Sequence, residues 1–329
     1  MNQVGGPLIC TTGASVSAQR RLYRGWAAGD YHKLAPGHFI DARTHRELSA
    51  TAQVWARITA YACTAPKTYV IGSSASLLWG FPEQRSHGQC LGAPVELGRS
   101  AGRTVHKGSV HYRALRREHS SRTRLMDTGF GIVQVTDRLT TCLDLARWNS
   151  LDDAVHALDH CLQKKWFTLG KVDSRVQEMG GAKRIDDIRQ AALLASAGSE
   201  SPRETKLKLL MWRLGLPVPL QQVNITSRRG TWLGRVDFFY PGLGLIIEYD
   251  GQGKYDLPAT DGRSVKEKEY DQTVEYLANG LSIVRVRKEH LSNGLAAEII
   301  VEQVRTLSGK GLSYPDHLWS GGVPAWRTG

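Results

Sequence analysis

The stretch RVDFFYPGLGLIIEYDGQGKYD, residues 235–256, decides how the second half of the chain folds. Two runs rich in Val, Ile, Phe and Tyr flank the turn sequence PGLG, so the stretch predicts a β-hairpin. A hairpin centred between Gly242 and Leu243 pairs residues whose numbers sum to 485. Asp237 and Glu248 meet that condition, so we expect their Cβ atoms to lie opposite each other, about 5 Å apart.

Carboxylates gathered on one face of the hairpin indicate a cation site. Asp250 lies two residues beyond Glu248 and therefore points the same way. Acidic groups that converge raise one another's pKa unless a positive charge lies between them. Because Mg²⁺ is usually held by carboxylates, waters and a substrate phosphate, we expect Asp237 and Glu248 to bind Mg²⁺ or Mn²⁺. A solvent-facing hairpin is the simpler alternative, and the apolar run LGLIIEY disfavours it.

The segments around the hairpin predict alternating helices and strands. SPRETKLKLLMWRLGLP opens with Ser201 as N-cap, Pro202 at the first helical position and Glu204 three residues after the cap, which predicts a capping box. Glu204 also lies one turn before the apolar stripe of this helix, so it could instead reach the hairpin carboxylates. After the hairpin we expect a helix, a strand and a helix, over 264–278, 281–287 and 294–307. This order of elements predicts an α/β sandwich.

The charge of the chain points to a polyanionic partner. The net charge is +12 and the pI is about 9.6. Residues 1–200 carry 26 Lys and Arg against 17 Asp and Glu, or +9, whereas residues 201–329 carry 17 against 14, or +3. We expect nucleic acid rather than a membrane, because the sequence shows neither a basic amphipathic helix nor a long apolar stretch.

A basic helix near the N-terminus is the first candidate for DNA contacts. It carries Arg20, Arg21 and Arg24, and short extended pieces around Pro36 follow it. A basic helix that leads into a small hairpin is typical of a winged helix-turn-helix. A solvated basic helix has the same sequence pattern, so that alternative stays open.

A second basic segment lies in the middle of the chain. Residues 99–124 hold eight Arg or Lys and only one acid. The segment is either a surface that follows the phosphate backbone, with Arg113, Arg116 and Arg117 as DNA contacts, or a sheet edge protected by positive charge.

Composition divides the chain into four parts. We expect a winged-helix-like DNA-binding region over 1–85 and a basic α+β region over 86–198. The α/β sandwich then follows over 199–310, after the turn-forming sequence GSESP, and residues 311–329 should form a loosely ordered tail.

Cysteine usage and the N-terminus indicate a cytoplasmic protein. The five cysteines are an odd number, widely spaced, and form no C-x-x-C pair, which disfavours a disulfide framework and a zinc knuckle. The start MNQVGGPLIC does not resemble a signal peptide, and no run approaches transmembrane length.

The C-terminal half contains five short sequence motifs, SPRET, RVDF, IIEYDGQGKY, VKEKEYD and LSIVRVRKEHL. In order and spacing they resemble the very-short-patch-repair-type branch of the PD-(D/E)XK nuclease superfamily, found as a C-terminal domain in many actinobacterial proteins. Residues 14–165 resemble the AbiEi-type antitoxin region that often precedes it, through GHFID, SSASLLWGFP and VTDRLTTCLDLAR. The resemblance implies a restriction-endonuclease-like α/β sandwich after a winged-helix-like and mixed α+β region.

The resemblance also implies roles for the acids. Asp237 and Glu248 would bind the metal, and Glu204 would be the acid of the first helix. The superfamily signature has a lysine two residues after the second acid, where this chain has Asp250. Lys254 in the GQGKY turn or Lys268 on the next helix would have to replace it.

Helical periodicity favours Lys254 over Lys268. The helix that holds Lys268 has an apolar stripe at Tyr270, Val274 and Leu277, which we expect to face the sheet. Glu267 is the residue aligned with that stripe. Lys268 follows it, so its side chain would point about 100° away from the side that faces the sheet.

Together these patterns predict a Mg²⁺-dependent DNA endonuclease with an N-terminal DNA-binding region. The competing class is a catalytically inactive DNA-binding regulator or antitoxin, partnered with a toxin or phage-defence protein. The carboxylates favour the enzyme, whereas Asp250 in place of lysine favours the regulator. A protein-interaction scaffold is a third class.

Overall fold

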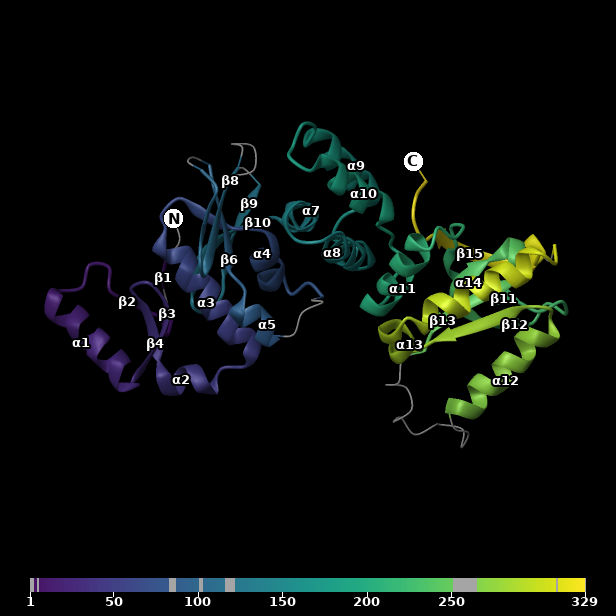
Figure 1. The fold of residues 1–329 in the computed structure, drawn as a ribbon, viewed down its shortest axis with the longest axis horizontal. Coiled ribbons are helices and arrows are strands. Elements are labelled where there is room, and N and C mark those ends of the chain that lie inside the picture. Colours follow the sequence, from purple (N-terminus) through teal and green to yellow (C-terminus); the bar gives the residue numbers. More distant parts are fainter. Residues whose placement is uncertain are drawn as a thin grey trace. The chain divides into compact units, whose positions relative to one another are not determined.

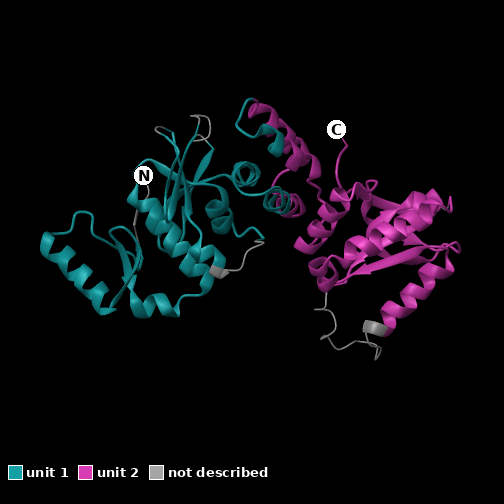
Figure 2. Cartoon of the chain, viewed as in Figure 1, with its two compact units in different colours: residues 1–157, 181–188 teal, residues 158–180, 189–329 magenta. Residues whose placement is uncertain are grey.

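The computed structural model shows a mixed α/β protein (Figure 1). It describes residues 3–4, 6–82, 87–100, 103–115, 122–250, 265–311 and 313–328. Contacts divide the chain into two compact units, Met1–Ala157 with Gly181–Ile188, and Leu158–Gly180 with Arg189–Gly329 (Figure 2). The division therefore differs from the boundary expected at 198/199, since much of 158–198 packs with the C-terminal residues.

A small antiparallel sheet opens the first unit. Its strands lie in the order β2 (Ile9–Cys10), β4 (His38–Asp41), β3 (Tyr31–Ala35). The basic helix α1 (Val16–Ala28) is capped by the Ser15 side chain and ends at Gly29, whose φ of 88° suits glycine. It leads directly into β3, as the sequence predicted.

A larger sheet follows, in the order β1-β10-β5-β6-β8-β7, with β9 paired to β10. The strands are β1 (Gln3–Val4), β5 (Thr68–Val70), β6 (Val95–Arg99), β7 (Val105–Lys107), β8 (Val110–Ala114), β9 (Thr123–Asp127) and β10 (Gly131–Thr136). Helix α3 (Ala50–Thr64) packs on this sheet, because Val54 and Ile58 share a core cluster with Val70, Leu97 and Val135.

Other helices surround these sheets or lead to the second unit. They are α2 (Ala42–Glu47), α4 (Gly72–Trp79), α5 (His87–Gly92), α7 (Arg138–Trp148), α8 (Leu151–Gln163), α9 (Leu169–Glu178) and α10 (Ile185–Leu194). Within the described residues, no helix is long and apolar enough to cross a membrane.

The second unit contains a five-stranded sheet in the order β14-β13-β12-β11-β15. The strands are β11 (Leu220–Thr226), β12 (Trp232–Tyr240), β13 (Leu245–Tyr249), β14 (Ser282–Val286) and β15 (Trp319–Pro324). Besides α9, the helices of this unit include α11 (Pro202–Arg213), α12 (Val265–Ala278), α13 (Lys288–Asn293) and α14 (Leu295–Ser308), with short 3-10 turns at η1 (Pro241–Leu243) and η3 (Asp316–Leu318).

Helices cover both faces of this sheet. Tyr276 of α12 shares a core cluster with Phe239, whereas the hydroxyl of the next residue, Tyr240, donates to the sulfur of Met211 on α11 at 3.5 Å. Successive strand residues point to opposite faces, so α12 and α11 lie on opposite sides of β12.

The predicted hairpin register is confirmed. The pairs Phe238–Ile247, Phe239–Ile246 and Tyr240–Leu245 all have numbers that sum to 485. The turn is η1 followed by Gly244, whose φ of 55° lies in the left-handed region.

The expected apolar stripe of α12 is wrong. Tyr270, Val274 and Leu277 are 70%, 46% and 56% exposed, while Tyr276 is fully buried. The buried side of the helix is partly polar: Gln272 donates through Nε2 to the backbone oxygen of Leu233 at 3.2 Å and to the Tyr276 hydroxyl at 3.0 Å. The side of α12 that faces the sheet thus combines the buried Tyr276 ring with polar bonds, and the three expected stripe residues lie on other sides of the helix.

The expected loose tail is also wrong. Strand β15 forms the edge of the five-stranded sheet by antiparallel pairing with β11. Tyr314, Leu318 and Trp326 are buried, and the Tyr314 hydroxyl donates to the backbone oxygen of Thr226 at 2.6 Å. The Gly, Ser and Pro residues of the tail gave no sign of a strand, and the buried aromatic residues Tyr314 and Trp326 flank it.

Candidate active site

Two of the expected metal ligands lie on neighbouring strands. Continuing the β12–β13 register by one residue places Asp237 opposite Glu248. The backbone N–H of Tyr249 donates to Asp237 Oδ2 at 2.8 Å and so fixes the direction of that carboxylate. Both acids are partly exposed, which leaves them accessible from solvent.

Glu204 joins these acids from α11. The Ser201 side chain caps the helix as predicted, and Glu204 Oε2 accepts from the backbone N–H of Glu200 at 2.9 Å. Glu204 is only 7% exposed. Burial, followed by repulsion from Asp237, raises the pKa of Glu204 to about 7. Glu204 thus accepts from the residue before the N-cap rather than from Ser201 itself, so the predicted capping box does not form in full, whereas the repulsion from Asp237 fits the alternative that Glu204 reaches the hairpin acids.

Gln222 is a site residue that the sequence did not reveal. Its Nε2 donates to Glu204 Oε2 at 3.2 Å. On β11 its neighbours Gln221 and Val223 pair with Phe238 and Val236, which places Gln222 opposite Asp237. Its φ is 59°, a left-handed conformation that costs energy for a residue other than glycine. No sequence pattern around QQVNIT marks this conformation.

Arg285 of β14 and Arg287, which follows that strand, supply positive charge beside two of the acids. In the parallel β13–β14 pair, Glu248 lies beside Arg285, and Arg285 Nε lies 3.2 Å from Glu248 Oε2. Arg287 Nε likewise lies 2.9 Å from Asp250 Oδ2. The sequence LSIVRVR thus provides cations beside Glu248 and Asp250, so these two acids do not depend on a metal ion alone for compensating charge.

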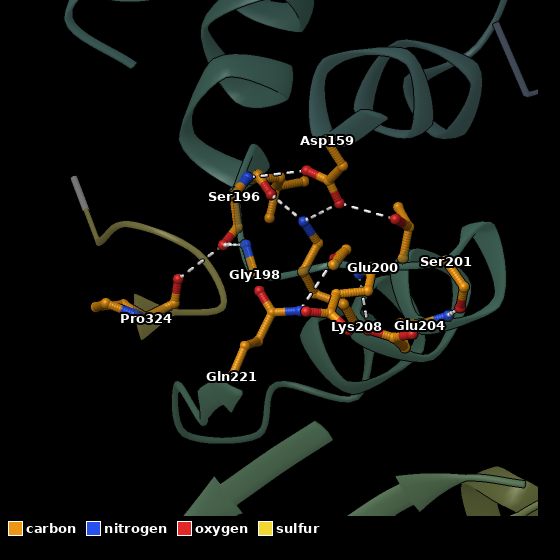
Figure 3. A network of polar contacts seen from close by, with 12 residues as sticks. Asp159, Ser196, Gly198, Glu200, Ser201, Glu204, Lys208, Gln221 and Pro324 are labelled. Atoms are coloured by element: carbon orange, nitrogen blue, oxygen red, sulfur yellow. Dashed lines mark hydrogen bonds and ion pairs between the residues drawn. The ribbon is translucent and has the colours of Figure 1, made fainter. Parts of the chain in front are cut away.

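A buried network fixes α11, and with it Glu204 (Figure 3). Lys208 and Asp159 have side chains that are 0% and 1% exposed, and Nζ lies 2.6 Å from Oδ2. Lys208 also donates to the backbone oxygen of Leu194 at 2.7 Å, and Thr205 donates through Oγ1 to Asp159 Oδ2 at 2.8 Å. Burial lowers the pKa of Lys208, and Asp159 opposes that shift. The C-terminal half of α8 is thereby joined to α11.

The described residues contain no group of three or more His, Cys, Asp or Glu side chains arranged to hold a metal ion. The acids that meet are Glu204 and Asp237, with Glu248 beside them. Lys254 lies outside the described residues. Lys268 is exposed on α12, one helical turn before Gln272.

The expected DNA contacts differ in their surroundings. Arg20, Arg21 and Arg24 are exposed on α1. Arg113 is held by Glu96, with Nη2 2.6 Å from Oε1, and lies 5.0 Å from the Trp148 ring centroid. That ion pair ties β8 to β6. Arg116 and Arg117 lie outside the described residues.

Comparison with known proteins gives partial similarity. Two uncharacterized proteins of Mycobacterium tuberculosis, MT2308 of strain CDC 1551 / Oshkosh and Rv2248 of strain ATCC 25618 / H37Rv, are each 29% identical to the chain over 127 residues. The similarity covers 37% of this chain and 46% of each relative, so the chain spans about half the length of the curated relatives it matches. No family model matches the chain.

Proposed function

We propose that the second unit is a PD-(D/E)XK-type, metal-dependent DNA endonuclease domain. The observation that carries this proposal is the meeting of buried Glu204 from α11 with Asp237 from β12, next to Glu248 of β13. Helices on both faces of a mixed sheet are consistent with the restriction-endonuclease-like sandwich that the sequence motifs imply.

The acids fit a hard divalent cation such as Mg²⁺ or Mn²⁺. One or two carboxylates, completed by waters and a substrate phosphate, are a usual ligand set for Mg²⁺. Asp237 and Glu248 would bind the ion directly. Glu204 would contact the ligands of the ion rather than the ion itself. A bound cation would supply polarisation of the scissile phosphate and a lower pKa for an attacking water.

The chain's own residues would set the geometry for that chemistry. The Tyr249 N–H orients Asp237, and Gln222 with the Glu200 N–H orients Glu204. Lys254 or Lys268 would neutralise charge on the attacked phosphate in place of the lysine that Asp250 replaces. The contact of the buried Asp250 carboxylate with Arg287 supports a structural role for Asp250.

The first unit would bind the DNA. Helix α1 presents three exposed arginines and leads into the β3–β4 hairpin, an arrangement that supports a winged-helix-like region. Lys33 of β3 lies 4.8 Å from the Trp26 ring centroid, so basic and aromatic groups gather on this surface. We place the protein in the cytoplasm, where DNA is accessible.

A second candidate function is a DNA-binding regulator or antitoxin that does not cleave, with a toxin or phage-defence protein as partner. The Arg285–Glu248 contact favours it, since an arginine there competes with a metal ion for the carboxylate. The two functions differ in one observable, which is cleavage.

The test is a nuclease assay on plasmid and single-stranded DNA with Mg²⁺, Mn²⁺ or EDTA. We expect wild type to cleave with a divalent metal, Asp237→Asn to lose cleavage, and Glu302→Gln to behave as wild type. Glu302 is a matched control because it is an exposed acid of the same unit, 3.1 Å from Arg305. DNA binding without cleavage under all conditions would select the regulator.

A further inference from the structure

A cavity of about 610 Å³ lies in the first unit, where the turn after α3 meets the ends of β6, β7 and β8. Cavities of about 300–1,000 Å³ are the usual size for small-molecule sites. The cavity is separate from the carboxylate site of the second unit, and nothing in the proposed nuclease chemistry uses it.

Three cations line this cavity, Lys67, Arg99 and Lys107. None of the described lining residues is acidic. Within the described part of the chain, none of the three cations has a carboxylate partner. Cations concentrated without acids favour an anionic ligand.

Strand register explains why these side chains converge. Thr68 of β5 pairs with Arg99 of β6, and Tyr112 of β8 lies beside Leu97, two residues before Arg99. Side chains two residues apart on a strand share a face, so Arg99 and Tyr112 lie on the same side of the sheet. Lys107 comes from β7, which pairs with β8.

Arg99 is positioned to recognise a ligand. Its guanidinium carbon lies 5.3 Å from the Tyr112 ring centroid, and one Nη donates to the backbone oxygen of Arg103. Its Nε is buried, so a ligand in the cavity would meet the Nη groups of the guanidinium. The ring and the backbone contact fix the guanidinium in place, so a phosphoryl oxygen would meet a preorganised donor.

Lys67 occupies an unusual backbone conformation. Its φ is 61°, a left-handed value that glycine and asparagine adopt at lower cost. The turn itself therefore does not require lysine. Glycine or asparagine would adopt this conformation at lower cost, but neither would bring a positive charge to the cavity.

The end of α3 also lines the cavity through Thr64 and Ala65. A helix C-terminus carries about half a negative charge, which disfavours an anion. The three full positive charges of Lys67, Arg99 and Lys107 exceed this partial negative charge.

A second basic cavity of about 330 Å³ provides a contrast. Its arginines are already engaged, since Arg113 contacts Glu96, Arg147 contacts Asp144 and Arg184 contacts Asp187. Lys183 is the remaining cation of the smaller cavity, whereas Lys67, Arg99 and Lys107 of the larger cavity all lack such partners among the described residues, so the larger cavity has more charge available for a ligand.

We propose that the cavity lined by Lys67, Arg99 and Lys107 binds a phosphorylated ligand of nucleotide size. The cations take the phosphoryl groups, and Tyr112 with Val105 forms the apolar wall. The phosphoryl group belongs either to a free nucleotide or to nucleic acid, and the two sources share this chemistry.

The test is calorimetric titration of the full chain with ATP, inorganic pyrophosphate and adenosine at low salt. We expect saturable binding of ATP and pyrophosphate, and none of adenosine. Lys67→Asn and Lys107→Gln should each weaken ATP binding by about tenfold, the effect of one lost charge-assisted contact. Asparagine tolerates the left-handed turn, so Lys67→Asn should stay folded, and Lys107→Gln provides a second variant on a strand.

Lys165→Asn is the matched control, because Lys165 is an exposed lysine with φ 55° that does not line the cavity. It should bind ATP as wild type does. Saturating duplex DNA that displaces ATP assigns the site to nucleic-acid phosphate, while ATP binding that persists assigns it to a free nucleotide. The proposal is overturned if wild type binds neither ATP nor pyrophosphate, or if both cavity variants bind ATP as tightly as Lys165→Asn.

Discussion

Gln222 holds the Glu204 carboxylate from a backbone in the left-handed region, with Nε2 3.2 Å from Oε2 and φ at 59°. This strained backbone in the middle of β11 directs the Gln222 amide at the buried Glu204 carboxylate. Such strain persists where the surrounding structure holds the residue in place. Here β11, which carries Gln222, pairs on one side with β12, opposite Asp237, and on the other side with the edge strand β15.

Removing this amide should change the titration of Glu204 more than the stability of the unit. In Gln222→Gly the backbone strain is relieved while a hydrogen bond to the charged carboxylate is lost, and these effects oppose each other in the free energy of unfolding. Because a donor favours the ionised acid, we expect the pKa of Glu204 to rise, as followed by carboxyl NMR. Gln222→Asn, too short to reach, should behave alike; an unchanged pKa in both would refute the role.

Glu204 should make the protein less stable as the pH rises. Its pKa is raised from 4.5 to about 7 in the folded state, so between these values the folded chain binds the proton more strongly than the unfolded chain. The associated stability is full below about pH 4.5 and lost through about pH 7, a difference of about 3 kcal/mol.

The measurement for Glu204 is urea unfolding at several pH values in EDTA. Glu204→Gln keeps an oxygen that can accept from Gln222 and the Glu200 N–H but cannot ionise. We expect it to flatten the pH dependence and to be more stable than wild type at pH 8. A Glu204→Gln curve parallel to that of wild type, or to that of the control Glu302→Gln, would count against a raised pKa.

The buried Lys208–Asp159 pair should show strong non-additivity. Lys208→Met leaves the Asp159 carboxylate buried without its cation, which costs about 3–5 kcal/mol. Adding Asp159→Asn removes the uncompensated charge and keeps an oxygen for the Ser196 N–H, so the double variant should recover much of the loss. A double-mutant cycle by chemical denaturation measures this; purely additive losses would mean that the pair acts independently.

Arg285 should weaken metal binding if Glu248 is a ligand. Arg285→Gln removes a competing interaction of about 1 kcal/mol, which corresponds to about fivefold tighter Mg²⁺ binding by calorimetry. Arg235→Gln, which removes an exposed contact to Glu200, serves as the control. If neither wild type nor Arg285→Gln binds Mg²⁺ or Mn²⁺, the regulator becomes the better assignment.

Local rules were sufficient where the sequence repeats a simple geometry. The register of the hairpin follows from its turn, and the start of α11 follows from Ser201 and Pro202. They failed on α12, where Tyr270, Val274 and Leu277 face solvent while Gln272 and the buried Tyr276 face the sheet. The left-handed Gln222 and the Arg285 partner of Glu248 depend on strands distant in sequence, which local pattern cannot reveal.

Strand β15 has a practical consequence for anyone who divides this protein into fragments. A piece that stops at residue 310 would leave β11 as an open edge, with unpaired backbone groups that invite aggregation. A fragment that starts at residue 199 would lack Asp159. The buried ammonium of Lys208 would then have no carboxylate partner in the interior. The smallest soluble version of the second unit should therefore begin before α8 and retain the final tryptophan.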